Sequence, residues 1–303
     1  MVSKKGCLFL SLLLLLTVSC QKPKPGCKIL LDWYPNANHL PLFVGEKQGI
    51  FKKHGLNLEL LILQDPPSTF SYLKTHQVDV ALCYFPSAIK AFSKYPKFKI
   101  IAKLFDEPHF CLFSKKAKTF QDLSSCSIGT YGDVFSKAVI NSLNKQNILF
   151  SKNLHSHGEL MHLLYFNQID VASGSINVEA IQLEDKLGYL HVFSWKDLNI
   201  PQHPEIVVVA NHSFLEKNPT FEKTFQQAVQ ESIVFCQNNP ELVIGWYFEL
   251  FPEKKRSKTW EMRSCLKTLD LFANSQKLEN SVIQDYVDWL ESNTTTQPQK
   301  ICR

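Results

Sequence analysis

Aromatic and acidic side chains stand where several short apolar runs of this sequence begin or end. Trp33 and Tyr84 each follow such a run, and Glu205 immediately precedes one. An aromatic ring stacks on the face of a flat ligand, and a carboxylate accepts hydrogen bonds from an amine on its edge. Because ligands of open α/β sheets lie beyond the strand ends, these three residues are candidates for ligand contacts. Packing in the core or at its rim is the alternative for both aromatic residues.

Three further polar residues are candidates because they begin predicted helices. Asn38 and His39 start a helix-like segment, where each either caps the helix or directs a donor into the cleft. Glu179 starts an amphipathic segment, where it either accepts a hydrogen bond from the ligand edge as a second carboxylate or only interacts with the helix dipole.

Short apolar runs and helical patterns alternate along most of the chain, which is typical of an α/β fold with a mostly parallel sheet. The absence of a Gly/Ser-rich linker favours two lobes joined by crossing strands, with the second lobe inserted into the first. We expect one lobe over 28–114 and 207–303 and the other over 115–206. The strands are expected at 27–32, 56–63, 78–82, 100–105, 110–113, 127–130, 169–172 and 206–210, and the longer helices at 39–53, 133–144 and 179–187, with a helical final third.

The N-terminus has the pattern of an export signal. Lys4 and Lys5 precede an apolar run, Leu8–Leu16, that is too short to span a bilayer of about 30 Å. Cys20 follows small residues and predicts a lipoprotein, with residues 1–19 as signal peptide and 20–27 as tether. Thr17 stands where such signals usually have Leu, so cleavage without lipid and an uncleaved anchor stay open.

The bulk composition narrows the function further. A formal net charge of +5, without dense basic runs, gives no argument for nucleic acid as a partner. The nine cysteines are scattered, with no C-x-x-C pair, so we expect no metal site. No basic residues are assigned to the cleft, and Asp133 in the Gly129–Asp133 turn would repel an anion, so a neutral ligand is expected.

One stretch resembles a known family. Asp32–His39 reads D-W-Y-P-N-A-N-H and is followed by Gly49-Ile50-Phe51 and Gly55-Leu56. This is similar to the start of periplasmic solute-binding proteins for thiamine pyrimidine precursors, of the sulfonate-type ABC importer family. Two more stretches, Asn177–Glu184 and Pro201–Pro219, are also similar.

The resemblance implies a type II periplasmic binding protein, with two α/β lobes that close on a hydroxymethyl- or formylamino-pyrimidine. It implies an ABC permease and ATPase as partners, and a monomer in the periplasm or cell envelope, held at the membrane by its lipid. Ser87, Tyr131 and Asn177 join the candidate ligand-binding residues through this resemblance. In the relatives, the turn that contains Tyr131 resembles a place where helix N–H groups hold the polar end of a ligand, although an ordinary helix cap at Asp133 is the alternative.

The same superfamily contains a fungal enzyme, hydroxymethylpyrimidine phosphate synthase, which uses pyridoxal phosphate and iron. Our alignment places Cys83 at its Schiff-base lysine and Ser87 at its metal-binding histidine, and its cysteine-rich stretch falls at Pro201–Glu205, which has no cysteine. A thiol does not form that Schiff base, and a hydroxyl is a poor iron ligand. The sequence therefore predicts a binder without cofactor. A synthase-like enzyme and a binder of a sulfonate or of intact thiamine are the alternatives.

Overall fold

Ten short strands form two sheets in the computed structural model, which describes residues 26–62, 69–92, 94–131, 133–154 and 157–294. The predicted signal peptide, Cys20 and most of the predicted tether lie outside these residues, and the Asp133 side chain is outside the description too. Among the described residues, none of the helices combines the length and the apolar composition that spanning a bilayer requires.

The first sheet has the order β2-β1-β3-β10-β4. β1 runs parallel to β2 and β3, whereas β10 runs antiparallel to β3 and β4. The strands are β1 (Cys27–Leu30), β2 (Leu58–Leu61), β3 (Val80–Tyr84), β4 (Phe98–Lys103) and β10 (Ile206–Asn211).

The second sheet repeats this arrangement in the order β7-β6-β8-β5-β9. β6 runs parallel to β7 and β8, and β5 runs antiparallel to β8 and β9. The strands are β5 (Phe110–Ser114), β6 (Ser127–Thr130), β7 (Ser151–Leu154), β8 (Val171–Ser175) and β9 (His191–Phe193).

The chain changes sheet twice, between β4 and β5 and between β9 and β10. The strands that follow these crossings, β5 and β10, are the ones that run antiparallel to their neighbours, because neither enters through the crossover helix that parallel pairing requires. Both sheets are therefore mixed rather than mostly parallel. β5 belongs to the second sheet, whereas the sequence placed residues up to 114 in the first lobe. The other lobe limits remain predictions.

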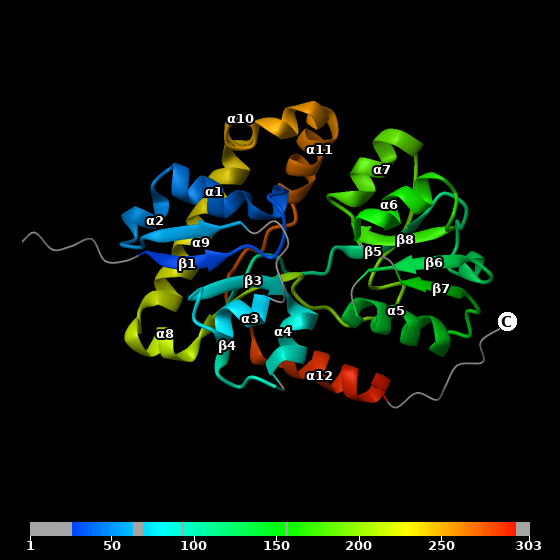
Figure 1. Cartoon of the computed structure of the whole chain (residues 1–303), viewed down its shortest axis with the longest axis horizontal. Helices are drawn as coiled ribbons and strands as arrows, with labels where there is room; N and C mark the ends of the chain where they lie inside the picture. Colours follow the sequence, from blue (N-terminus) through cyan, green and yellow to red (C-terminus); the bar gives the residue numbers. More distant parts are fainter. Residues whose placement is uncertain (1–25, 63–68, 93, 132, 155–156, 295–303) are drawn as a thin grey trace, which may run out of the picture.

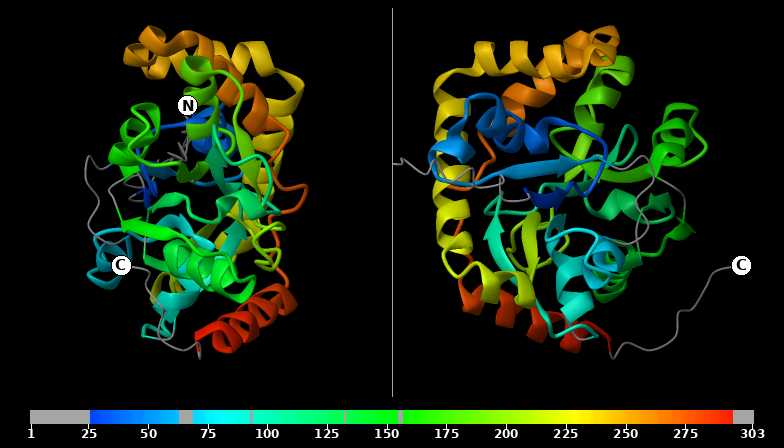
Figure 2. Two further views of the ribbon diagram at one scale, coloured as in Figure 1. Left: turned by 90° about the vertical axis from the view of Figure 1, so that its right-hand side faces the viewer. Right: turned by 60° about the vertical axis from the view of Figure 1, so that its left-hand side comes forward.

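Helices cover both sheets (Figures 1 and 2). The predicted helix over 39–53 is interrupted at Gly49, whose φ of 72° is left-handed and ends the regular turn. The α-helices are α1 (Leu40–Lys47), α2 (Ile50–Lys53), α3 (Thr69–Lys74), α4 (Phe85–Phe92), α5 (Asp133–Lys145), α6 (His157–Tyr165), α7 (Glu179–Leu187), α8 (His212–Lys217), α9 (Phe221–Asn238), α10 (Pro240–Leu250), α11 (Lys258–Leu269) and α12 (Asn280–Thr294); the 3₁₀ helices are η1 (Ala37–His39), η2 (Gln121–Leu123) and η3 (Pro252–Ser257).

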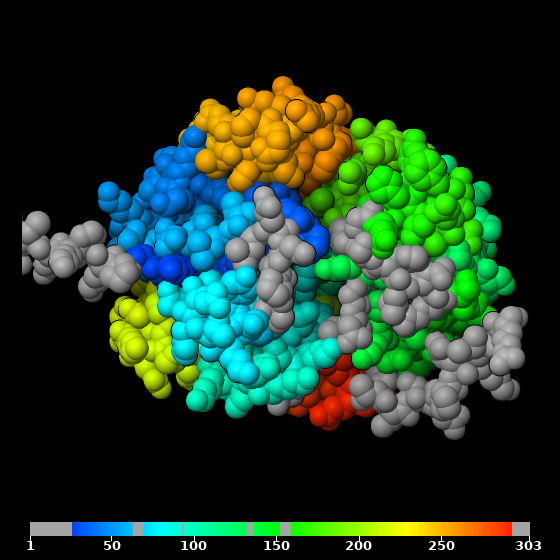
Figure 3. Space-filling model, viewed as in Figure 1, coloured from blue at the N-terminus to red at the C-terminus, as the bar shows by residue number. Residues whose placement is uncertain are grey.

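Strand β10 shows how the core is divided. Its side chains alternate between the faces of the first sheet, so Ile206 and Val208 pack under α1 and α9, whereas Val207 and Val209 belong to a second cluster. That second cluster continues into the other sheet through Leu112. Residues of the second sheet (green) lie beside those of the first (blue to cyan) in the space-filling view (Figure 3), and the two sheets share this part of the core.

Candidate functional site

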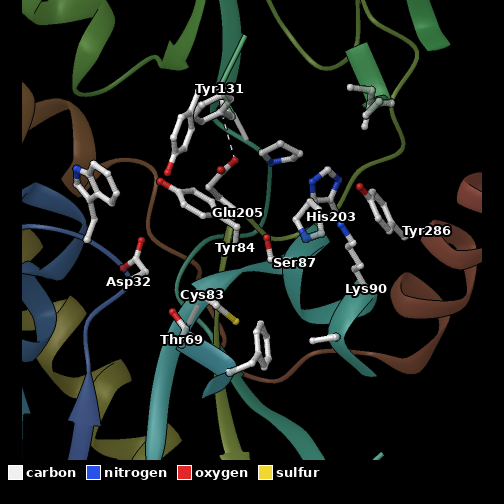
Figure 4. A pocket seen from close by; sticks show the side chains of 18 of the residues that line it. Asp32, Thr69, Cys83, Tyr84, Ser87, Lys90, Tyr131, His203, Glu205 and Tyr286 are labelled. Atoms are coloured by element: carbon white, nitrogen blue, oxygen red, sulfur yellow. Dashed lines mark hydrogen bonds between the residues drawn. The ribbon is translucent and has the colours of Figure 1, made fainter. Parts of the chain in front are cut away.

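A cavity of about 550 Å³ lies where the two sheets meet. Its walls come from the ends of β1, β3 and β6, from α3, α4, α5 and α12, and from both crossing segments (Figure 4). The lining residues that the argument below uses are Asp32, Trp33, Cys83, Tyr84, Ser87, Lys90, Lys94, Phe110, Tyr131, Trp195, His203, Glu205 and Tyr286. Of the nine ligand-binding residues predicted from sequence, the cavity brings together Trp33, Tyr84, Ser87, Tyr131 and Glu205.

Aromatic rings from both sheets meet edge-on in the cavity wall. Trp33, beyond β1, contacts Tyr131, beyond β6, edge-on with ring centroids 6.1 Å apart. Tyr84, the last residue of β3, meets Phe110 of β5 edge-on at the same centroid distance of 6.1 Å. Burial and the nearby Asp32 carboxylate raise the pKa of the Tyr84 and Tyr131 hydroxyls, so both remain neutral hydrogen-bonding groups at physiological pH. These rings provide flat, neutral walls on either side of the space.

Glu205 is a buried carboxylate at the start of β10. Its Oε2 accepts hydrogen bonds from the backbone N–H groups of His109 and Phe110, at 2.8 and 3.1 Å. Burial raises its pKa to about 7; the two hydrogen bonds oppose this shift, and the charges of Asp32 and Glu179 add to it. Within the described residues, Oε1 has no hydrogen-bond partner, which leaves one acceptor for a ligand.

Asp32 is a second carboxylate in the cavity wall, and the sequence analysis missed it. His39 Nε2 lies 2.8 Å from Asp32 Oδ1, and the backbone N–H of Asn36 donates to His39 Nδ1 at 3.3 Å. Since Nδ1 accepts, the proton belongs on Nε2, from which the neutral imidazole donates to Asp32. The second Asp32 oxygen has no partner in the described part of the chain. Asp32 could have been found from the sequence, because it directly precedes the candidate residue Trp33.

His39 itself does not line the cavity, although the sequence proposed it as a ligand-binding residue. Its side chain is fully buried beneath Asp32, which it holds in place. The Asn36 side chain caps η1 by accepting from the N–H of Asn38 at 2.9 Å, and His39 completes this capping box by accepting from the N–H of Asn36. The His39 side chain makes no capping bond to α1.

Asn38 and Asn177 lie outside the cavity and contact each other instead. Asn177 Nδ2 donates to Asn38 Oδ1 at 2.7 Å and is also 2.8 Å from Thr268 Oγ1. All three residues are buried, and they join η1, the loop before α7 and helix α11. These two predicted ligand contacts are thus a connection between the halves of the molecule.

Glu179 is also absent from the cavity wall. Its carboxylate accepts from the backbone N–H and the hydroxyl of Ser175, at 2.8 and 3.0 Å. Glu179 therefore has a local role at the start of α7, in line with the alternative to ligand binding given in the sequence analysis.

Two lysines correct the expectation that the cleft has no basic residues. Lys90 and Lys94 line the cavity together with Ser87, at helical spacing along α4 and the turn after it. Tyr286 of α12 and His203 complete this side of the cavity, and burial lowers the pKa of His203 to about 4, so it is neutral. The helical spacing of both lysines from Ser87 could have predicted that they line the cavity, whereas no sequence pattern connects Tyr286 to the site.

Cys83 tests whether the site suits the pyridoxal phosphate of the synthases. It lies in the wall at the position aligned with their lysine, and burial with the nearby Asp32 charge raises its pKa, so the thiol stays protonated. It offers no amine, and the described residues contain no grouping of three or more side chains placed to hold a metal ion. The residues present do not fit that cofactor.

Solved structures show which class of protein has this architecture. The *Escherichia coli* periplasmic aliphatic sulphonate binding protein superimposes with a TM-score of 0.72 at 14% identity, covering 91% of this chain and 95% of that one. A ligand-binding component of an ABC-type import system from *Staphylococcus aureus* gives 0.67 at 17% identity, covering 90% and 94%. The chain has the periplasmic binding protein fold.

Within that class, the chain belongs to the NMT1/THI5 like family, which matches residues 36–242. The formylaminopyrimidine-binding protein of *Halalkalibacterium halodurans* is 23% identical over 232 residues, 74% of this chain and 70% of that protein. A 4-amino-5-hydroxymethyl-2-methylpyrimidine phosphate synthase of *Legionella pneumophila* is 25% identical over 227 residues, 72% of this chain and 71% of that protein. Binders and synthases are similar to it to the same degree, so the site residues must separate the two activities.

Proposed function

We propose that this protein is the solute-binding component of an ABC importer and that its cargo is a thiamine-type aminopyrimidine with a hydroxymethyl or formylamino substituent. The observation that carries the proposal is the pair of buried carboxylates, Asp32 and Glu205, beside the aromatic walls of one cavity. A relative that binds formylaminopyrimidine supports the ligand class.

Each carboxylate has one oxygen held by the protein and one without a partner in the described residues. A ligand must therefore present donors to this edge, which an exocyclic amine on a pyrimidine does. A hydrogen bond to a charged group contributes about 1.5–3 kcal/mol, which applies to Glu205 above its pKa of about 7. The ring faces then lie against Trp33, Tyr84 or Tyr131. A ligand that is only an anion, such as a small sulfonate, would meet two carboxylates in this place.

The transport role follows from the position of the cavity between the two sheets. A ligand that contacts both halves stabilises the closed form, because it makes those contacts together only there. The closed form is the one that a permease and its ATPase would recognise. The protein acts in the periplasm or cell envelope as a monomer.

A synthase activity is disfavoured by the cavity wall itself. Cys83 is a protonated thiol at the position aligned with the Schiff-base lysine, and Ser87 stands at that of the metal-binding histidine. The protein binds its pyrimidine unchanged.

Calorimetric titration with 4-amino-5-hydroxymethyl-2-methylpyrimidine, its formylamino analogue, thiamine and an alkanesulfonate tests this proposal. We expect one of the two aminopyrimidines to bind most tightly, and Asp32→Asn and Glu205→Gln each to weaken its binding by about 1.5–3 kcal/mol. Glu179→Gln is the matched control, because Glu179 lies outside the cavity wall. Tightest binding of the sulfonate, or equal affinity in all variants, would contradict the proposal.

Membrane attachment through Cys20 is a separate proposal with its own test. We expect a radioactive fatty acid to label the protein in cells and the Cys20→Ala variant to remain unlabelled. Equal labelling of both forms, or of neither, would rule out a lipid at Cys20.

A further inference from the structure

A second cavity, of about 440 Å³, lies against the segments that cross between the two sheets. Its walls come from residues 106–111 and 194–196 along these crossings, from the segment 270–274 after α11, and from Ile176 and Val192 of the second half. Pro108, Phe110 and Trp195 line both cavities, so the crossing segments form the wall between them. The second cavity is therefore a place of its own, bounded by both halves of the molecule.

The side chain of His109 belongs to the second cavity and not to the first. It lines the second cavity, whereas its backbone N–H donates to Glu205, which lines the first. His109 is 6% exposed, and its Nδ1 has no hydrogen-bond partner among the described residues. Burial lowers its pKa to about 3, so the ring is neutral. An unpaired buried polar atom is costly, and a ligand hydroxyl, which both donates and accepts, would pair with either tautomer.

Carboxylates dominate the charged part of this second wall. Asp106, Glu107 and Asp270 line the cavity together with one lysine, Lys196, among the described residues. Asp106 is paired with Lys103 at 2.6 Å, and Glu107 lies 3.9 Å from Lys196. Asp270 has no charged partner in the described part of the chain. It is also the C-cap residue of α11, where a negative charge interacts unfavourably with the helix dipole. A bound cation would compensate this charge.

The remainder of the wall is mostly apolar. Phe272 is buried and stacks on Phe105, with ring centroids 5.0 Å apart, and His109 meets Phe105 edge-on at 4.5 Å. Leu271 and the half-buried Trp195 extend this apolar surface. No grouping of side chains within the described ranges is placed to hold a metal ion. The wall thus suits a cation with an apolar body.

We propose that the second cavity binds a small organic cation, an arylalkylamine whose ring carries a hydroxyl group. Asp270 is exposed and His109 is buried, so the ammonium group lies at the rim with Asp270 and the hydroxyl group bonds to His109 inside. The ring packs against the apolar wall between them. The volume of about 440 Å³ is within the range of about 300–1,000 Å³ that is typical of small-molecule sites. This site goes beyond the proposed function and does not depend on which cargo the first cavity holds.

Calorimetry with three matched compounds tests this site. The probes are tyramine, phenethylamine, which lacks the hydroxyl group, and 4-hydroxyphenylacetate, which has a carboxylate in place of the amine. The proteins are the wild type, Asp270→Asn, His109→Phe and the control Asp285→Asn. Asp285 is an exposed carboxylate on α12 that lines neither cavity.

We expect tyramine to bind the wild type and the control about two- to tenfold more tightly than phenethylamine, because of its additional hydrogen bond. The carboxylate probe should not bind. Asp270→Asn should weaken both amines by about two- to fivefold, as is usual for an exposed charge pair. His109→Phe should remove the advantage of tyramine over phenethylamine. Comparing two ligands on one variant separates this effect from any change in stability, and a thermal unfolding scan of each variant checks that it is folded.

Four results would overturn the inference. They are no binding of either amine to the wild type, equal binding of the carboxylate probe, the same amine affinities in Asp270→Asn as in Asp285→Asn, and an advantage of tyramine that persists in His109→Phe. Should His109→Phe not fold, Asp270→Asn still decides, because its position is exposed. Titration with pyrimidines tests the proposed function separately, so either claim can fail without the other.

Discussion

The five functional residues within Asp32–His39 have separate physical roles. Asp32 presents a carboxylate to the cavity, and Trp33 forms part of its wall. Asn36 caps η1 and fixes the tautomer of His39, which in turn holds Asp32. Asn38 bonds to the other half of the molecule. One short segment thus combines ligand contacts, their support and a connection between the two sheets.

Trp33 allows a direct test at the residue scale. Trp33→Ala should weaken binding of the preferred aminopyrimidine by more than about 1.5 kcal/mol, roughly tenfold in Kd, because a stacked ring face is lost. Calorimetry measures the change. Tyr189→Ala is the control, since Tyr189 is an aromatic residue, 76% exposed, outside the cavity wall. Unchanged affinity in Trp33→Ala would remove this ring from the site.

Glu205 makes the stability of the ligand-free protein depend on pH. Its pKa rises from an ordinary 4.5 to about 7 on folding, so the folded chain holds this proton more tightly. The stabilisation is complete below pH 4.5 and is lost as the pH rises to about 7. His203, whose pKa falls to about 4, acts in the opposite direction, so the wild type must be compared with a variant.

We therefore expect Glu205→Gln to gain stability relative to the wild type as the pH is raised from 5 to 8, a window that includes the pKa of about 7. Differential scanning fluorimetry without ligand gives both Tm values at each pH. Glu179→Gln serves as a control for a carboxylate outside the cavity wall. If the difference in Tm between Glu205→Gln and the wild type did not change with pH, the claim that folding raises the pKa of Glu205 would be contradicted.

At the scale of elements, a buried polar contact joins three segments from different parts of the chain. Asn177 bonds to Asn38 of η1 and to Thr268 of α11. Asn177→Ala should destabilise the fold by about 1–3 kcal/mol, because it leaves buried polar atoms without partners. Chemical denaturation measures this loss. Asn144→Ala, at an exposed position of α5, should change stability little, and a similarly small effect at Asn177 would show that the contact contributes nothing.

The elements were largely predictable because apolar periodicity is a local signal. The strands at β1, β6 and β10 and the helices α5 and α7 all lie where the sequence indicated them. Strand direction was not predictable, because a fully buried strand such as β10 reads as one apolar run whether its neighbours are parallel or antiparallel. The strands β7 and β9 and the helix α6 were missed.

The residues of the candidate site were also only partly predictable from the sequence. Trp33, Tyr84 and Glu205 were found because strand ends gather at one edge of a sheet. Residues that begin helices were misjudged, because a polar side chain there serves a cap, a neighbouring side chain or a ligand equally well. Asn38 and Glu179 are examples. Tyr286 reaches the cavity only through the packing of α12, which no local pattern specifies.

For the whole molecule, the shared core limits how the two halves can move. The second hydrophobic cluster contains Leu112 of β5, Val207 of β10 and Tyr286 of α12 and so continues across both sheets. Closure should therefore occur as a rotation about the two crossing segments. We expect the radius of gyration, measured by small-angle X-ray scattering, to fall when the preferred aminopyrimidine is added. An unchanged value at saturation would contradict closure on the ligand.

The most direct test of the account is a crystal structure of the protein with the aminopyrimidine that it binds most tightly. We expect the ring between the two sheets, against Trp33, with its amine within hydrogen-bond distance, about 2.7–3.2 Å, of Asp32 or Glu205. A ligand bound elsewhere, or a ring in the cavity with its amine turned away from both carboxylates, would contradict the central claim.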